Sequence, residues 1–180
     1  MSESVIIEDK EFKLFISKEL ISEKVAELGK RLSEDYRFLN PVFIPILNGA
    51  FVFASDLIRQ IMIPSEMAFV KLSSYEAMES TGHIRLLQDL NRSIEGRHVI
   101  IVEDIVDTGQ TLSWFCQYLI AFKPASVVIA ALLLKPDKLQ VPLEVKYLGI
   151  SIPDAFVVGY GMDYREQGRN LPAIYQLKEI

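Results

Sequence analysis

The sequence predicts an α/β fold in which a mostly parallel, twisted sheet is flanked by helices. Two observations lead to this prediction. Short, nearly all-apolar runs, namely PVFIPIL (41–47), HVIIVED (98–104) and SVVIAALLL (126–134), are typical of strands that are buried on both faces. Segments with helical periodicity lie between these runs, and such alternation favours parallel strands joined by helical connections.

The elements follow in order along the chain. The first helix is predicted at 17–37, because apolar residues recur there at helical spacing after Ser17, a suitable N-cap. Further helices are predicted at 50–61 and 111–122, and further strands at 67–75, 145–152 and 156–161. Ligands bind such sheets beyond the carboxyl ends of the strands, so the segments after Leu47, Val102 and Leu134 should lie together at one edge.

Length and composition fit one domain of 180 residues, half of them hydrophobic. The formal net charge of −5 argues against a nucleic-acid partner bound through its phosphates. The N-terminus carries acids where a signal peptide needs positive charge, and no apolar run approaches the ~20 residues that span a bilayer. The single cysteine, Cys116, fits a reducing compartment and is interpreted as a buried small hydrophobe. We therefore expect a cytoplasmic protein without a membrane segment.

The stretch VIIVEDIVDTGQTL (99–112) joins a buried strand to a helix through hydroxyls and a glycine. The N-terminus of a helix offers free backbone N–H groups and a positive dipole end, which suit a phosphate group. Gly109 permits a positive φ and a close approach of the backbone, and Thr108 and Thr111 add hydroxyl donors. Taken by itself, the DTG turn is also compatible with a plain helix cap.

Two neighbouring carboxylates, Glu103 and Asp104, precede this turn. They would repel a phosphate, so their expected partners are sugar hydroxyls or Mg²⁺. A phosphate-binding turn beside acids that accept hydrogen bonds from a diol describes a site for ribose 5-phosphate.

This stretch resembles the phosphoribosyl pyrophosphate signature of the type I phosphoribosyltransferases. The whole chain, from PILNGAFVF to FVVGYGMDYREQGRNL, resembles the hypoxanthine(-guanine) phosphoribosyltransferases. The resemblance implies the type I phosphoribosyltransferase fold, with a small hood built from the terminal segments. Residues 1–180 would form one such domain, with a mobile lid loop at about 73–83.

The implied reaction is the Mg²⁺-dependent transfer of 5-phosphoribosyl from phosphoribosyl pyrophosphate to a 6-oxopurine. Hypoxanthine or guanine would be the acceptor in purine salvage, and IMP or GMP and pyrophosphate would be the products. The resemblance also implies a homodimer or homotetramer. Neither a nucleic acid nor a membrane is expected as a partner.

Within the signature, the resemblance implies that Glu103 and Asp104 hold the ribose hydroxyls, with or through Mg²⁺. Asp107 would face the imidazole ring of the purine and act as the general base. The 5-phosphate would be bound by five consecutive residues, Asp107, Thr108, Gly109, Gln110 and Thr111.

Three further segments match pyrophosphate-binding parts of the family. Leu47, Asn48 and Gly49 match a loop that commonly reads L-K-G and carries a non-proline cis peptide, so Asn48 replaces the usual lysine. Ser74 and Tyr75 resemble the Ser-Tyr pair of the mobile catalytic loop, although the pattern is equally typical of a long β-hairpin. The resemblance further implies that Arg169 contacts pyrophosphate and that Asp163 coordinates Mg²⁺ with it.

The resemblance implies that the purine site is formed by Lys135, Phe156 and Val157. In the family, the lysine donates to the exocyclic oxygen of a 6-oxopurine, the aromatic ring stacks on the base, and the valine backbone reads the base edge. A cationic donor suits an oxo group and is mismatched to the amino group of adenine. Individually these residues are compatible with a surface lysine and core apolar residues, as Asp163 and Arg169 are with solvated charges.

Several alternatives stay open at this point. One is the same enzyme class with a preference for xanthine, since Lys135 and Phe156 do not rank the 6-oxopurines. A second is a regulator of the same fold that binds nucleotides without turnover. A pyrimidine transferase has no place for FVVGY with an upstream lysine, and a purely structural protein leaves the acidic strand ends unexplained. His83 and His98 lie outside the matched motifs and are interpreted as strand residues, and Trp114 as a core-facing helix residue.

Overall fold

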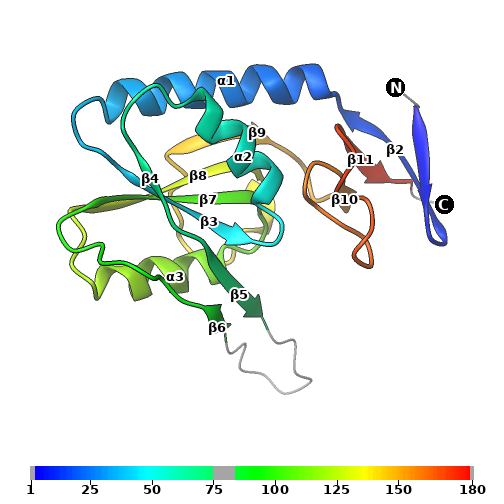
Figure 1. The fold of residues 1–180 in the computed structure, drawn as a ribbon. Helices are drawn as coiled ribbons and strands as arrows, with labels where there is room; N and C mark the ends of the chain where they lie inside the picture. Colours follow the sequence, from blue (N-terminus) through cyan, green and yellow to red (C-terminus); the bar gives the residue numbers. More distant parts are fainter. Residues whose placement is uncertain (1–2, 75–83, 179–180) are drawn as a thin grey trace.

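The computed structural model describes residues 3–74 and 84–178, and it contains a large sheet, a smaller sheet and helices (Figure 1). The helices are α1 (Lys18–Asp35), α2 (Phe51–Gln60), α3 (Gln110–Ile120) and the 3₁₀ helix η1 (Pro136–Lys138). The strands are β1 (Ser4–Ile7), β2 (Lys10–Ile16), β3 (Val42–Leu47), β4 (Glu66–Met67), β5 (Val70–Ser74), β6 (Ile84–Gln88), β7 (His98–Val106), β8 (Ser126–Leu134), β9 (Tyr147–Ser151), β10 (Val157–Val158) and β11 (Ile174–Leu177).

The large sheet has the strand order β6-β5-β3-β7-β8-β9, and β4 also pairs with β3. All pairs in it are parallel except β5 with β6, which is an antiparallel hairpin at the edge. The predicted mostly parallel sheet is therefore confirmed. His98 begins the central strand β7, as its interpretation as a strand residue requires.

Helices cover both faces of this sheet, with α1 and α2 on one face and α3 on the other (Figure 1). The predicted N-cap of α1 is confirmed, because the Ser17 side chain accepts a hydrogen bond from the Leu20 N–H at 3.3 Å. The apolar face of α1 is buried against the sheet, and it comprises Ile21, Val25, Leu28 and Leu32. On the opposite face, Trp114 and Cys116 of α3 are partly buried against a second apolar cluster, which lies between α3 and the sheet and includes Leu112, Phe115 and Leu119.

The two chain ends meet in the small sheet, whose order is β1-β2-β11-β10 with antiparallel pairing (Figure 1). It buries its own apolar cluster, which includes Phe12, Val158 and Tyr175. This arrangement is the hood of terminal segments that the family resemblance implies. The hydrophobic pattern had indicated none of β1, β2 and β11.

The predicted end of the central strand was wrong. The strand was predicted at 98–104, but β7 continues to Val106 because residues 105 and 106 still pair with β8. The segment predicted as one strand at 67–75 is divided into β4 and β5, which both pair with β3.

The strand predicted at 156–161 is also shorter, because β10 holds only two residues. Gly159 and Gly161 follow it with φ angles of 100° and 103°, and this left-handed backbone turns the chain out of the strand.

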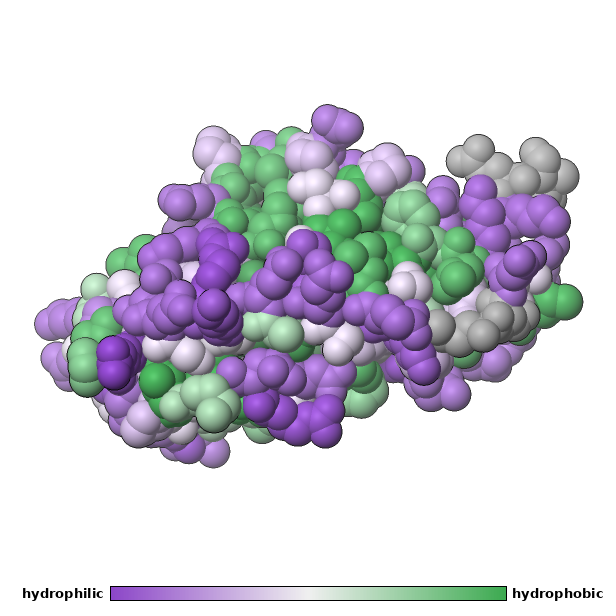
Figure 2. Space-filling model, turned by 90° about the horizontal axis from the view of Figure 1, so that it is seen from above, coloured by the Kyte–Doolittle hydropathy of each residue, from purple (hydrophilic) through white to green (hydrophobic). Residues whose placement is uncertain are grey.

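The surface on the α1 side combines polar and apolar areas. Figure 2 shows a band of hydrophilic residues beside a hydrophobic area on this side. A cavity of about 820 Å³ lies between α1, α2 and the segment 169–172. Among the described residues, no helix is both long and apolar enough to cross a membrane.

Candidate active site

The carboxyl ends of β3, β7 and β8 meet at one edge of the large sheet, as predicted. Two neighbouring cavities of about 260 Å³ and 600 Å³ lie there. They share four lining residues, Gly49, Leu72, Ile105 and Asp107. We call them the phosphate cavity and the base cavity, after the groups that the sequence predicts for each.

The phosphate cavity is lined by the turn between β7 and α3, including Asp107, Thr108, Gly109 and Thr111. Gly109 has a φ of 78°, which a glycine adopts without strain, and it directly precedes the first residue of α3. The first N–H groups of α3 have no acceptor within the helix. The turn thus has the donors that an anionic phosphate needs.

A segment after η1 supports this turn from outside. The Gln140 N–H donates to the Thr108 carbonyl at 2.9 Å. The Gln110 side chain donates to Gln140 Oε1 at 2.6 Å, so Gln110 faces this segment and does not line the phosphate cavity. A side chain at position 109 would come within 3.1–3.3 Å of three apolar residues, Leu139, Val141 and Leu143.

Glu103 lines the phosphate cavity, whereas Asp104 lines the base cavity. Glu103 Oε2 is buried and has no hydrogen-bond partner among the described residues. Burial raises the pKa of Glu103 well above its ordinary value, and the neighbouring Asp104 adds to this effect. Burial also raises the pKa of Asp104, against the opposing effect of backbone hydrogen bonds and the positive charge of Arg169. An unpaired buried carboxylate is costly, which is typical of a site that a ligand completes.

The loop after β3 lies beside these acids and contains a cis peptide bond between Leu47 and Asn48. This bond agrees with the family feature given above. Leu47 and Gly49 line the phosphate cavity, and Gly49 also lines the base cavity. Among the described residues that line the two cavities, Asn48 does not appear.

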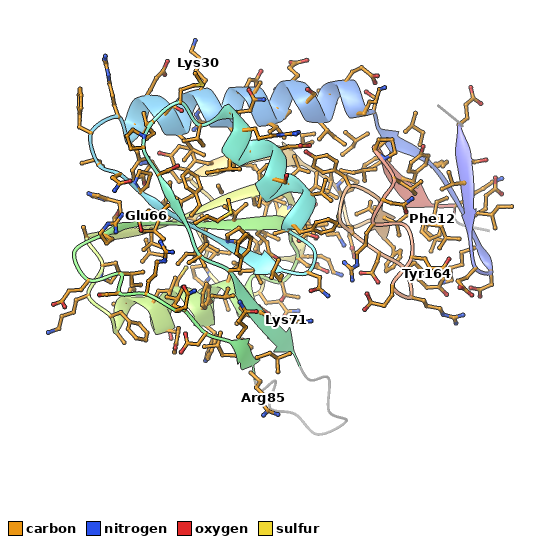
Figure 3. The ribbon with its side chains drawn as sticks, viewed as in Figure 1. Phe12, Lys30, Glu66, Lys71, Arg85 and Tyr164 are labelled. Carbon is orange, nitrogen blue, oxygen red and sulfur yellow. The ribbon has the colours of Figure 1, made fainter. Side chains whose placement is uncertain are left out.

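The base cavity is lined by Lys135, Phe156 and Val157, which come from three different segments. The Lys135 side chain is only 8% exposed, although it carries a charge. Phe156 is 47% exposed as a residue, and its ring packs edge-on against Tyr164, with ring centroids 5.9 Å apart. Tyr164 in turn packs against Phe12 of the hood at 6.1 Å, and Figure 3 shows these two side chains close together. A flat base therefore has an exposed ring on which to stack.

Lys135 belongs to a cluster of four charges with Asp107, Lys138 and Asp154. Lys135 Nζ lies 3.3 Å from Asp154 Oδ1 and 3.6 Å from Asp107 Oδ2. Lys138 Nζ lies 3.3 Å from Asp107 Oδ1 and 3.3 Å from Asp154 Oδ1. The predicted base Asp107 is thus ion-paired with two lysines.

Sequence reasoning missed Lys138 and Asp154. Lys138 follows Lys135 by three residues in KPDK, and a Pro-started 3₁₀ turn places residues three apart on the same side. That motif was a usable signal for Lys138. Asp154 carried no such signal, because it joins the cluster from a segment 19 residues away.

Asp163 and Arg169 lie at the hood side of the base cavity and form an ion pair of 2.7 Å. The Arg169 guanidinium also donates to the Gly161 carbonyl at 2.8 Å and to Glu166 at 3.0 Å. Asp163 further accepts a hydrogen bond from the Glu166 N–H at 2.8 Å. The structure therefore holds the predicted pyrophosphate arginine and the predicted metal carboxylate against each other.

The three predicted metal ligands, Glu103, Asp104 and Asp163, do not form a metal-binding group by themselves. The described part of the chain contains no group of three or more His, Cys, Asp or Glu side chains placed to bind a metal ion. Mg²⁺ is commonly bound by one or two carboxylates together with substrate phosphates, so the separated acids are compatible with a metal that enters with its substrate.

Most of the predicted lid, at about 73–83, lies outside the described residues. Ser74 is the last residue of β5, and Tyr75 lies outside the described residues, as do His83 and the rest of 75–83. Two cationic residues, Lys71 on β5 and Arg85 on β6, lie on the described part of this hairpin (Figure 3).

Comparisons with known proteins show the family to which this chain belongs. The phosphoribosyl transferase domain family matches residues 16–165. The hypoxanthine-guanine phosphoribosyltransferase of Dictyostelium discoideum is 44% identical over 184 residues, covering 99% of this chain and 97% of the relative. The Bacillus subtilis protein of the same name is 43% identical over 167 residues, covering 92% and 93%.

A solved structure gives the same result. The crystal structure of a hypoxanthine phosphoribosyltransferase from Staphylococcus aureus superposes with a TM-score of 0.89 at 43% identity, covering 92% of this chain and 91% of that one. The sheet order, the hood and the cis peptide agree with the fold that the sequence motifs imply. This chain belongs to the phosphoribosyl transferase domain family.

Proposed function

We propose that this chain is an enzyme of purine salvage that transfers 5-phosphoribosyl from phosphoribosyl pyrophosphate to a 6-oxopurine. Hypoxanthine and guanine are the proposed acceptors, and IMP or GMP and pyrophosphate are the products. The family membership and the names of relatives over 40% identical support this reaction class. The observation that carries the proposal is the buried Glu103 Oε2, which has no hydrogen-bond partner among the described residues, in a side chain that lines the cavity at the N-terminus of α3.

The ribose 5-phosphate lies across the turn 107–111 and the acids Glu103 and Asp104. Its phosphate accepts hydrogen bonds from the backbone of residues 107–111 and from the hydroxyls of Thr108 and Thr111. Its 2- and 3-hydroxyls donate to Glu103 and Asp104. These hydrogen bonds give Glu103 Oε2 the partner that it lacks among the described residues.

The purine occupies the base cavity against the exposed ring of Phe156. Lys135 donates to the 6-oxo group, and the Val157 backbone contacts the base edge. Asp107 accepts the imidazole proton as the purine nitrogen bonds to the anomeric carbon and pyrophosphate leaves. Asp107 lines both cavities, which is the position that this role requires.

Pyrophosphate leaves between the loop 47–49 and the hood. Backbone N–H groups of this loop and the guanidinium of Arg169 bind its charge. The carboxylate of Asp163, or those of Glu103 and Asp104, would hold Mg²⁺ together with substrate phosphates, and the metal would supply positive charge that neutralises the departing pyrophosphate. A homodimer or homotetramer in the cytoplasm completes the proposal, with the single Cys116 fitting a reducing compartment.

The test is an assay of pyrophosphate release with phosphoribosyl pyrophosphate, Mg²⁺ and one of four bases: hypoxanthine, guanine, xanthine or adenine. Release with hypoxanthine or guanine and little release with adenine is the expected result. Activity with adenine but not with hypoxanthine would overturn the role given to Lys135. Absence of release with every base would instead favour a nucleotide-binding regulator of the same fold.

A further inference from the structure

The charge cluster at the base cavity contains a carboxylate, Asp154, that touches no proposed ligand position. Asp154 lies between β9 and β10, two residues before Phe156, and its side chain is 57% exposed. It does not line either cavity, whereas Lys135, Asp107 and Phe156 line the base cavity. Its contacts are with the two lysines of the cluster.

Lys135 depends on its carboxylate partners because its ammonium group is nearly buried. A buried charge without a partner is strongly destabilising, so Lys135 needs an acidic partner within the protein. Asp154 is the closer partner, since Lys135 Nζ donates a hydrogen bond to Asp154 Oδ1 at 3.3 Å. The contact with Asp107 is longer, at 3.6 Å.

Lys138 is the partner that remains for Asp107. Its Nζ lies 3.3 Å from Asp107 Oδ1 and 3.4 Å from Asp107 Oδ2. Hydrogen bonds with Asp107 and Asp154 raise the pKa of Lys138, which keeps it charged. If Lys135 turns from Asp107 to a ligand, Asp107 therefore stays paired with Lys138, and Asp154 stays paired with Lys135.

We propose that Asp154 is a positioning residue that fixes the direction of the Lys135 ammonium group and thereby sets selectivity for a 6-oxo group. This inference rests on the proposed function, because it assigns a role within that base site. An ammonium group has three N–H donors. With one N–H held by Asp154, another is directed toward the base cavity, where an oxo group accepts it and an amino group does not.

The electrostatics of Asp154 support this role. Burial acts to raise the pKa of Asp154, but hydrogen bonds from Lys135 and Lys138 outweigh it and lower the pKa. The other charged groups around the base cavity are Asp104, Asp163 and Arg169, and the last two are paired with each other at 2.7 Å. The fixed partner of Lys135 in the ligand-bound site is thus Asp154.

The experiment replaces this carboxylate by an amide of equal size, Asp154→Asn, and measures the dissociation constants of IMP and AMP by calorimetry. IMP binding should weaken at least about fivefold, as expected when an oriented charged hydrogen bond is lost, and AMP binding should change less than about twofold. In turnover, KM for hypoxanthine should rise while KM for phosphoribosyl pyrophosphate stays constant. Asp154→Glu, which keeps the charge, should lie between Asp154→Asn and the parent.

The control is Asp137→Asn, which removes one negative charge from an exposed position in η1. It should leave the preference for IMP over AMP unchanged. Asp154→Ser replaces Asp154→Asn as the test if the latter does not yield folded protein.

Two outcomes contradict the proposal. Equal weakening of IMP and AMP would indicate a merely structural role, and an unchanged preference for IMP would exclude any role in selectivity. Either result, with a parent enzyme that turns over hypoxanthine, overturns this inference alone. A parent chain that releases no pyrophosphate with any base overturns the proposed function instead.

Discussion

Gly49 lies directly against the carboxylate of Asp104. A Cβ atom at position 49 would come within 2.7 Å of Asp104 Cγ, closer than atoms that are not bonded can approach. The loop after β3 can therefore pack this closely against the acidic end of β7 only because residue 49 has no side chain. Asp104 is itself almost buried, so its carboxylate has little room to move away.

We predict that Gly49→Ala damages ligand binding more than folding. The added methyl group must displace the Asp104 carboxylate from the position that we propose for a ribose hydroxyl. KM for phosphoribosyl pyrophosphate should rise about tenfold or more, which corresponds to the loss of one charged hydrogen bond. Steady-state kinetics measures the effect, and an unchanged KM would show that Asp104 does not contact the substrate.

We predict that Asp107→Ala lowers kcat by roughly 10² or more, as the loss of a general base usually does. The reason is that no other carboxylate is described in both cavities. The measurement is the rate of IMP formation at saturating substrates, with a parallel check that IMP still binds. Near-normal turnover would remove Asp107 from the proposed mechanism.

We predict that Glu103→Gln makes the ligand-free protein more stable. Glu103 Oε2 is buried and finds no hydrogen-bond partner in the described part of the chain, and an amide avoids the cost of a buried charge. A gain of about 1 kcal/mol corresponds to roughly 2–4 °C in Tm for a chain of this size. Such a gain with loss of activity is typical of functional residues that are not optimal for stability.

The pH dependence of this gain has a definite sign. Because the folded-state pKa of Glu103 is raised above its ordinary value of 4.5, its contribution to parent stability is fully present below pH 4.5 and is lost as the pH rises toward the folded-state pKa. The Tm advantage of Glu103→Gln should therefore grow between pH 4.5 and neutrality. Thermal unfolding across this range tests it, and an advantage that is constant with pH would contradict the assigned burial effect.

We predict that Tyr160→Phe destabilises the fold by about 1 kcal/mol, the usual value of a lost internal hydrogen bond. The buried Tyr160 hydroxyl donates to Asp56 at 2.6 Å and thereby joins the segment after β10 to α2. Burial and the nearby Asp56 raise the pKa of Tyr160, so the hydroxyl stays a donor.

Tyr118→Phe is the matched control for this variant. Its hydroxyl donates to Asp89 at 2.7 Å in an exposed setting, where water replaces a lost partner. Denaturant unfolding should show the larger loss for Tyr160→Phe. Equal losses would mean that burial does not increase the contribution of the Tyr160–Asp56 hydrogen bond to the free energy of unfolding.

The parallel sheet and its helices could be predicted because their signals are local. The apolar runs of β3, β7 and β8 are almost continuous, and Ser17 caps α1 where a helix N-cap is expected. The hood strands could not be recognised by pattern, because β2 and β11 pair across more than 150 residues of sequence and carry mixed polar and apolar residues.

The same distinction applies to the site. The turn 107–111 was recognisable because strand, acids, glycine and hydroxyls follow one another directly. The pairing of Lys135 with Asp154, and the packing of Gly49 against Asp104, join segments that only the folded chain brings together. Residues that would bind the phosphate, ribose, base and pyrophosphate could therefore be predicted from the sequence. Which of these residues contact and restrain one another could not.

The most direct test of the account is a crystal structure of this protein with IMP. We predict that the phosphate accepts hydrogen bonds from the backbone of residues 107–111, that the ribose hydroxyls contact Glu103 and Asp104, and that the base lies on Phe156 with its oxo group at Lys135. A structure in which the phosphate occupies another place, such as the cavity between α1 and α2, would contradict the central claim.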